Sequence, residues 1–171
     1  MKTSTRLGII SSMAVIGLFS SKILFADDPK YVGVDKCKIC HMKQYKSWQN
    51  TKHAKAFESL KTDEAKKFSP EPTKDKNCLT CHVTGLGKAG GYVSADDAAS
   101  AKLEGVQCEV CHGPGEKYKD VKIMKDKALA LKNGLIEPNE KTCLACHNNK
   151  AAPTFKEGAW DYNKYYGEIK H

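Results

Sequence analysis

Four copies of one short pattern, Cys-x-x-Cys-His, run through this chain and use all eight of its cysteines. The copies are Cys37–His41, Cys78–His82, Cys108–His112 and Cys143–His147. Two thiols three residues apart lie on one turn of backbone, where each can bond to one vinyl group of a haem, and the next histidine then faces the iron. Because this is the attachment motif of c-type haem, the sequence predicts four covalently bound haems.

Each motif residue has an expected role. The predicted covalent attachment residues are Cys37, Cys40, Cys78, Cys81, Cys108, Cys111, Cys143 and Cys146. The predicted proximal iron ligands are His41, His82, His112 and His147. Other uses of paired cysteines fit less well. Two zinc sites would leave the four following histidines unexplained, a disulfide framework would have varied spacing, and a thioredoxin-like pair does not occur in fours.

The first 26 residues have the layout of a secretory signal peptide. Lys2 and Arg6 supply the positive start, residues 7–19 are mostly apolar, and Ala26 suits a cleavage site. The alternative is an uncleaved membrane anchor, but a lysine interrupts the apolar stretch and leaves it short for a span. We therefore expect one exported domain over 27–171, soluble or peripheral to a membrane, and periplasmic in a host with two membranes.

The composition restricts both the core and the partners. Only 8% of the residues are aromatic and 40% are hydrophobic, which is thin for an ordinary apolar core, so we expect the porphyrins to form much of it. The formal net charge is +8, but Arg6 is the only arginine. Because grooves that read nucleic acid favour arginine, and because the protein is expected to be exported, nucleic acid is excluded as a partner.

The segments between the motifs predict a mainly α fold with short helices, long loops and little or no sheet. Helices are expected over 41–60 with a break near Asn50-Thr51, over 63–68, over 96–103, and over 116–132, the longest, ended by Asn133-Gly134. The glycines of 85–91 predict a flexible loop, and Gly113-Pro114-Gly115 predicts a tight turn. The aromatic tail after Phe155 is expected to pack on haem faces.

Few side chains remain to ligate the far side of each iron. Four irons need eight axial ligands, and beyond the motifs the chain has only His53 and His171 as histidines. We predict both as distal ligands, and Met124 as the one credible thioether ligand, although it could equally pack in a core. Tyr118 and Lys122 are weaker candidates. At least one haem is left without an obvious sixth ligand and could bind a small molecule.

Several segments resemble the tetrahaem cytochrome c-554 family and its multihaem relatives. The resemblance rests on the first motif with Ser47-Trp48 and residues 51–56, on the second motif with residues 83–87, and on Gly105-Val106 with the Cys-His-Gly-Pro-Gly turn of the third. It implies a mainly helical fold with closely packed haem pairs. It also implies that His53 and His171 are distal ligands and that the second haem, held by Cys78, Cys81 and His82, is five-coordinate.

One feature departs from that family. Its founding member has a histidine ligand shortly after the third motif, whereas no histidine lies between His112 and His147 here. Met124 would replace that ligand, or a second haem would be open.

Two functions follow from these features. The first is electron transfer between a redox donor and a redox acceptor protein, which the dense haems, small size and exported address favour. The alternative is an enzyme that reduces nitric oxide or another nitrogen oxide at the open haem, most readily at His82. A subunit of a larger haem complex is also compatible with the short chain.

Overall fold

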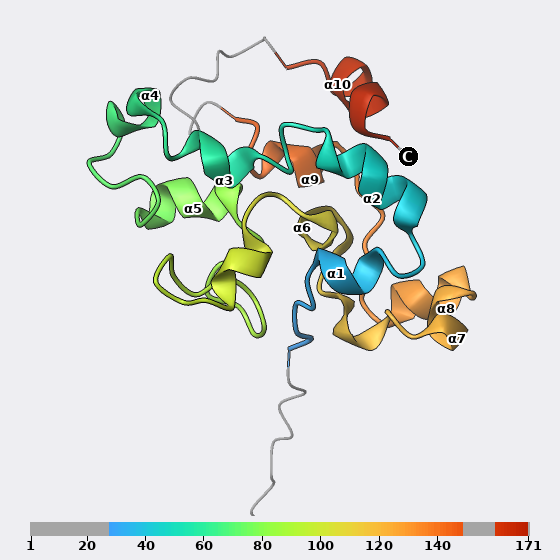
Figure 1. Ribbon diagram of the computed structural model, residues 1–171. Helices are drawn as coiled ribbons and strands as arrows, with labels where there is room; N and C mark the ends of the chain where they lie inside the picture. The colour runs from blue at the N-terminus through green and yellow to red at the C-terminus, as the bar shows by residue number, and fades with distance from the viewer. Residues whose placement is uncertain (1–27, 149–159, 171) are drawn as a thin grey trace, which may run out of the picture.

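The computed structural model describes residues 28–148 and 160–170, and this part of the chain is helical (Figure 1). Its α-helices are α1 (Val34–Cys37), α2 (Met42–Gln49), α3 (Ala56–Ser59), α4 (Asp63–Lys66), α5 (Lys76–His82), α6 (Cys108–His112), α7 (Val121–Met124), α8 (Lys127–Lys132), α9 (Glu140–Leu144) and α10 (Tyr162–Ile169). Two 3₁₀ helices, η1 (Ser100–Leu103) and η2 (Gly115–Lys117), complete the set. No described helix has the length and apolar content needed to cross a membrane.

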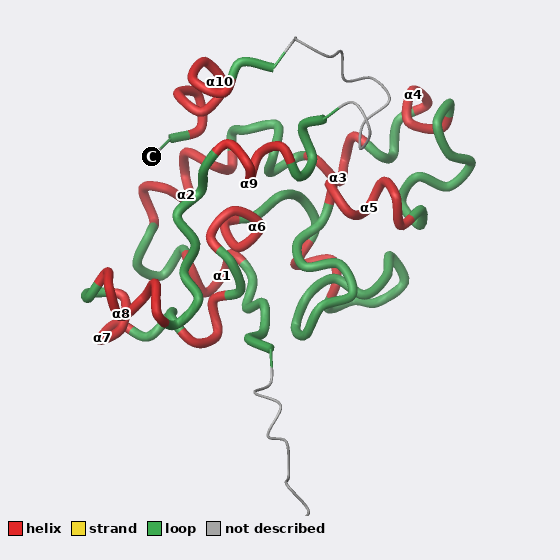
Figure 2. Tube along the Cα trace, turned by 180° about the vertical axis from the view of Figure 1, so that it is seen from behind, coloured by secondary structure: helices red, strands yellow, loops and turns green. Residues whose placement is uncertain are grey.

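The expected mainly α class is confirmed. Long loops connect the short helices (Figure 2), and the only β pairing within the described ranges is an isolated bridge between Val83 and Glu104. The predicted break near Asn50-Thr51 is present, since α2 ends at Gln49 and α3 begins at Ala56.

The prediction of one long helix over 116–132 is wrong. The segment instead forms η2, α7 and α8, and two aspartates mark the interruptions. The carboxylate of Asp120 accepts a hydrogen bond from the N–H of Lys122 at 2.9 Å, and that of Asp126 accepts one from Leu129 at 3.0 Å. Each aspartate thus caps a new helix rather than continuing the old one. The predicted end at Asn133-Gly134 is correct, because α8 ends at Lys132.

The segment 96–103 is helical only at its end, where η1 covers Ser100–Leu103. The carboxylate of Asp97 accepts hydrogen bonds from both the N–H and the hydroxyl of Ser100, at 2.9 and 2.7 Å. This local turn replaces the first helical turn that the sequence suggested.

The glycine-rich loop is more constrained than expected. Tyr92 at its end is fully buried, and its N–H donates to the carbonyl of Thr84 at 3.0 Å. A Cβ on Gly91 would lie 1.9 Å from the carbonyl oxygen of Gly85, so the two backbones touch. The glycines therefore allow close packing here.

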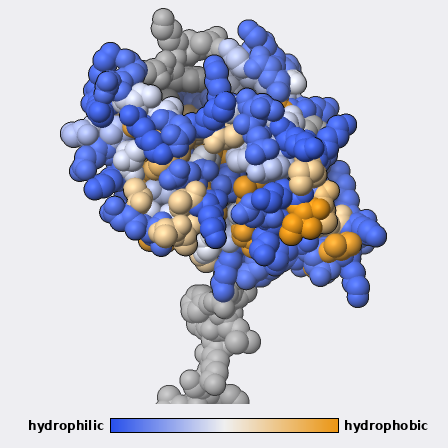
Figure 3. Space-filling model, in the orientation of Figure 1, coloured by the Kyte–Doolittle hydropathy of each residue, from blue (hydrophilic) through white to orange (hydrophobic). Residues whose placement is uncertain are grey.

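The apolar core of the described residues is small. Its main cluster consists of Phe57, Leu60, Leu79, Val83, Tyr92 and Leu103. It joins α3 to α5, so it lies around the second Cys-x-x-Cys-His motif. Most of the surface seen in Figure 3 is hydrophilic, with an apolar group near the α7–α8 end, where Val121, Leu129, Leu131 and Ile136 are exposed.

Candidate functional site

Each Cys-x-x-Cys-His motif forms one helical turn. The second and third motifs lie within α5 and α6, while the first begins at the last residue of α1 and the fourth begins in α9. In the two motifs that extend beyond their helix, backbone hydrogen bonds close the turn. The N–H of His41 donates to the carbonyl oxygen of Cys37 at 3.0 Å, and the N–H of His147 donates to that of Cys143 at 2.9 Å. The two thiols of a motif therefore share one face, and all eight cysteines are free of disulfides.

Two of the predicted proximal histidines are oriented by backbone carbonyls. The Nδ1 atom of His82 lies 2.6 Å from the carbonyl oxygen of Ala56, and that of His112 lies 3.1 Å from the carbonyl oxygen of Ile136. Because a carbonyl oxygen only accepts, each Nδ1 must donate, which leaves Nε2 with a lone pair. A backbone carbonyl that accepts from the other ring nitrogen is the usual partner of a metal-ligating histidine, so both side chains fit an iron ligand.

The tertiary structure brings the motifs together in an order that differs from the chain order. The thiols of Cys37 and Cys108 interact as a pair, which raises the pKa of Cys37 and lowers that of Cys108. Cys81 and Cys146 form a second such pair, which lowers the pKa of Cys81 to about 7 and raises that of Cys146.

A third interaction between thiols links the third motif to the fourth. Burial first, and then the nearby Cys143, raise the pKa of Cys111 to about 11. These interactions, together with the packing of α1 against α6, indicate that the motifs follow one another in space in the order first, third, fourth, second.

His53 is held beside the fourth motif. Its ring centre lies 5.9 Å from that of His147, with the two planes inclined by 61°. Two opposite imidazoles on one metal atom have ring centres roughly 6 Å apart, given metal–nitrogen bonds of about 2 Å as in zinc sites. Burial, and then the charge of His147, lower the pKa of His53 and favour the neutral imidazole that metals bind.

The backbone around His53 is tied to the entrance of the third motif. The carbonyl oxygen of His53 accepts a hydrogen bond from the N–H of Val106 at 2.9 Å, and the indole of Trp48 donates to the carbonyl of Val106 at 2.8 Å. A Cβ on Gly105 would lie 2.6 Å from the carbonyl oxygen of Ala54, so only glycine permits this approach.

A cavity lies between α2, the third motif and the end of α10. Its lining includes Trp48, His53, Cys108, His112 and Ile169. Its walls combine residues of the third Cys-x-x-Cys-His motif with apolar, aromatic and polar side chains. The free thiols and the two oriented histidines show that the residues present fit covalently bound haem.

The other predicted distal ligands have different outcomes. Met124 lies half-buried on α7, which packs against α8 at the opposite end of the molecule from α5 and His82 (Figures 1 and 2). It is therefore remote from the second motif. His171 lies outside the described residues. The weaker candidate Tyr118 is used elsewhere, because its hydroxyl donates to the carbonyl of Gly113 at 2.6 Å.

The aromatic tail packs on a motif histidine. The ring of Trp160 stacks on the imidazole of His147 with centres 4.3 Å apart, and Tyr165 stacks on Trp160 at 4.9 Å. These contacts hold α10 near the fourth motif. Phe155, where the tail was expected to begin, is outside the described residues.

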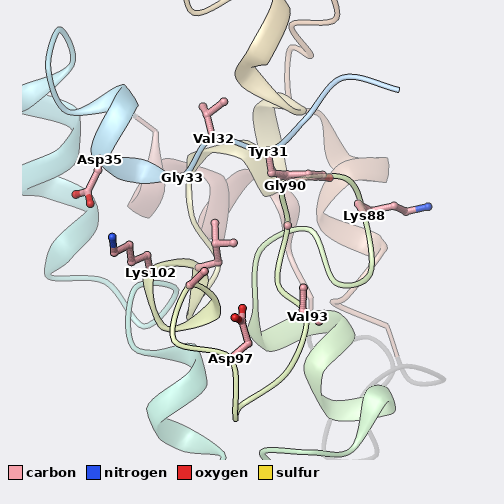
Figure 4. Close-up of a pocket in the computed structure, with 12 residues that line it drawn as sticks. Tyr31, Val32, Gly33, Asp35, Lys88, Gly90, Val93, Asp97 and Lys102 are labelled. Atoms are coloured by element: carbon pink, nitrogen blue, oxygen red, sulfur yellow. The ribbon is translucent and has the colours of Figure 1, made fainter. Parts of the chain in front are cut away.

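A second cavity, of about 350 Å³, lies away from the motif residues (Figure 4). Its lining includes Tyr31 next to Gly90, and the side chain of Lys102 points toward Asp35. None of the predicted attachment or ligand residues lines it.

Two further findings concern metal binding and a residue that the sequence analysis missed. Within residues 28–148 and 160–170, no group of three or more His, Cys, Asp or Glu side chains is placed to hold a metal ion directly. Glu109, inside the third motif, is 1% exposed and accepts several backbone hydrogen bonds. The motif leaves its two middle positions open, so the pattern itself carried no signal for a buried charge there.

Known proteins are similar to this chain in sequence and in fold. Residues 36–113 match the family described as cytochrome c554 and c-prime. The chain is 35% identical to cytochrome c-554 of Nitrosomonas europaea over 189 aligned positions, which cover 99% of this chain and 78% of the relative. A solved structure of the reduced state of cytochrome c554 from the same organism superposes with a TM-score of 0.65 at 29% identity, over 84% of each chain.

Proposed function

The chain belongs to the cytochrome c554 and c-prime family, and from this membership we propose that it is an exported carrier that passes electrons through four c-type haems. As a member of the family it is a multihaem c-type cytochrome, an electron carrier with covalently bound haem and redox proteins as partners. When bound, haem supplies reversible one-electron chemistry at iron. The chain's own residues attach it, orient its ligands and exclude water.

The row of neighbouring thiols carries this proposal. Cys37 meets Cys108, Cys111 lies near Cys143, and Cys146 meets Cys81, so haems attached at these residues would be neighbours in the order first, third, fourth, second. A continuous row of redox groups suits a carrier that accepts an electron at one end and releases it at the other.

We assign the axial ligands as follows. His41, His82, His112 and His147 are proximal. The ring of His53 lies next to that of His147, with ring centres 5.9 Å apart, which supports His53 as the distal ligand of the fourth haem. Ile169 lines the cavity of the third motif, which supports His171, two residues further along the chain, as the distal ligand of the third haem. Met124 is then the thioether candidate for the first haem.

The second haem is the candidate for an open iron. Met124 is remote from His82, and His53 lies against His147. This leaves the second motif without an assigned distal side chain and supports the alternative function, reduction of nitric oxide or another nitrogen oxide at that iron. The proposed location is the periplasm, after removal of residues 1–26 by cleavage following Ala26.

Three measurements on the haem-loaded protein test these proposals. The mass of the mature chain should correspond to residues 27–171 carrying four haems, and fewer haems would refute the tetrahaem proposal. Electron paramagnetic resonance of the ferric protein should show one high-spin iron, and the reduced protein should bind one carbon monoxide. Four low-spin irons that bind no gas would overturn the reductase alternative and leave electron transfer alone.

A further inference from the structure

Glu109 is a charged side chain buried between two haem-attachment residues. It lies one residue after Cys108 and two before Cys111, with 1% of its surface exposed. None of the ion pairs formed by the described residues includes it. Burying a carboxylate without a cation is costly unless hydrogen bonds compensate, so its partners need an explanation.

Backbone N–H groups supply that compensation. One oxygen of Glu109 accepts from Val32 at 2.9 Å and from Gly115 at 2.6 Å, and the other accepts from Gly33 at 2.7 Å. Gly115 is packed closely here, since a Cβ on it would lie 3.1 Å from the Glu109 carboxylate and 3.0 Å from Val32. Both oxygens receive donors, which is the arrangement that an ionised carboxylate accepts.

The partners of Glu109 belong to a segment that leads to the first motif. We call residues 30–34 the strap, because they cross the third motif and continue into α1 and Cys37. Three side chains hold the strap: Glu116 accepts from Lys30 at 2.9 Å, Glu109 accepts from Val32 and Gly33, and Gln107 accepts from Val34 at 2.9 Å. Glu109 is the central contact and the only one of the three within a Cys-x-x-Cys-His motif.

The charge of Glu109 affects the pKa values of the paired thiols in the first and third motifs. Its charge raises the pKa of Cys37, after the larger effects of Cys108 and of burial. Its charge also acts to raise the pKa of Cys108, against the larger lowering effect of Cys37. It also contributes, after burial, to the raised pKa values of Tyr31, which is part of the strap, and of Tyr118. The first and third motifs therefore share one buried negative charge.

We propose that Glu109 is a positioning residue that docks the first haem site onto the third and keeps the reduction potentials of both haems low. This inference rests on the proposed tetrahaem function. A fixed negative charge in a poorly solvated interior stabilises the more positive ferric iron over the ferrous iron, and hydrogen bonding and burial are the means by which proteins set haem potentials. The two haems of this pair would then differ in potential from the pair at the second and fourth motifs.

The direct test compares Glu109→Gln with Glu116→Gln. Both changes remove one negative charge from a side chain that binds the strap, but Glu109 is buried between the motifs and Glu116 contributes from the outer edge. Potentiometric titration of the holoprotein should show that Glu109→Gln raises two of the four reduction potentials. The equilibrium constant for reduction of each of these haems should increase about tenfold, which corresponds to about 59 mV. Glu116→Gln should leave all four close to those of the natural protein.

Haem content separates the two proposals. The mass of each protein is measured first, and a natural protein with fewer than four haems refutes the proposed function rather than this inference. A Glu109→Gln protein that carries four haems at unchanged potentials overturns the inference. So does a uniform shift of all four, since a local charge cannot act equally on every site.

A second variant covers the case in which Glu109→Gln does not load four haems. Val32→Lys keeps the backbone donor to Glu109 and introduces a cation beside it, and Val93→Lys adds the same charge at a position that is 70% exposed. We expect Val32→Lys to raise the same two potentials and Val93→Lys to change none appreciably. Equal potentials in these two variants would then overturn the inference.

Discussion

The imidazoles of His53 and His147 lie beside each other, edge to face, with ring centres 5.9 Å apart, although 94 positions separate them in the chain. His147 ends the fourth motif, and His53 comes from the loop between α2 and α3. The hydrogen bond from Val106 to the carbonyl of His53 fixes that loop. Among the residues that the structure describes, this pair gives the geometric support for a bis-histidine site.

Replacing His53 should open one iron. In His53→Ala the fourth haem would lose its distal ligand, so the ferric protein should show one additional high-spin signal and the ferrous protein should bind one additional carbon monoxide. Lys52→Ala, at the exposed neighbouring position, is the matched control and should leave the spectrum unchanged. An unchanged spin state in His53→Ala would remove His53 from the ligand set.

The stack between Trp160 and His147 should hold the tail helix in place. Aromatic stacking contributes about 0.5–1.5 kcal/mol beyond area burial. In Trp160→Leu, amide hydrogen exchange across α10 should therefore accelerate by about two- to tenfold. Trp160→Phe keeps an aromatic ring and should exchange at a rate closer to that of the natural protein. If amide exchange in Trp160→Leu is as slow as in the natural protein, α10 is held by other contacts.

The small apolar cluster should dominate the stability of the region around the second motif. Phe57 is 3% exposed within that cluster, so Phe57→Ala should lower the free energy of unfolding by about 3–5 kcal/mol. Phe68, which is 52% exposed, provides the control, and Phe68→Ala should change it by less than about 0.5 kcal/mol. Denaturant unfolding of the holoprotein measures the free energy of unfolding of each variant. Similar decreases in Phe57→Ala and Phe68→Ala would contradict the assignment of the core.

Close backbone packing in the glycine-rich loop should make Gly91 intolerant of substitution. The Cβ of Gly91→Ala would meet the carbonyl of Gly85, so the variant should be destabilised by about 1–3 kcal/mol. Gly167→Ala has no neighbour within 4 Å in α10 and should be neutral or gain about 0.5–1 kcal/mol from helix propensity. Thermal unfolding compares the two, and a neutral Gly91→Ala would show that the loop can move apart.

Local rules predicted some segments and failed at others for a physical reason. The break near Asn50 and the end at Gly134 were correct because they depend on neighbouring residues alone. The helix over 116–132 was wrong because Asp120 and Asp126 compete with the helix by binding backbone N–H groups, and composition does not show which of these bonds will form. The loop at 85–91 was expected to be flexible because glycine permits many conformations, whereas its packing depends on Gly85 and Tyr92.

The amino-acid sequence by itself determined the chemistry of this protein. Cys-x-x-Cys-His encodes attachment and a proximal ligand within five residues, so no tertiary information is needed to recognise it. Only the tertiary structure decided which motifs are neighbours, that His53 lies beside His147, and that Glu109 lies buried beneath the strap. These relationships join residues far apart in the chain, and they arise from packing and backbone hydrogen bonds that no local pattern specifies.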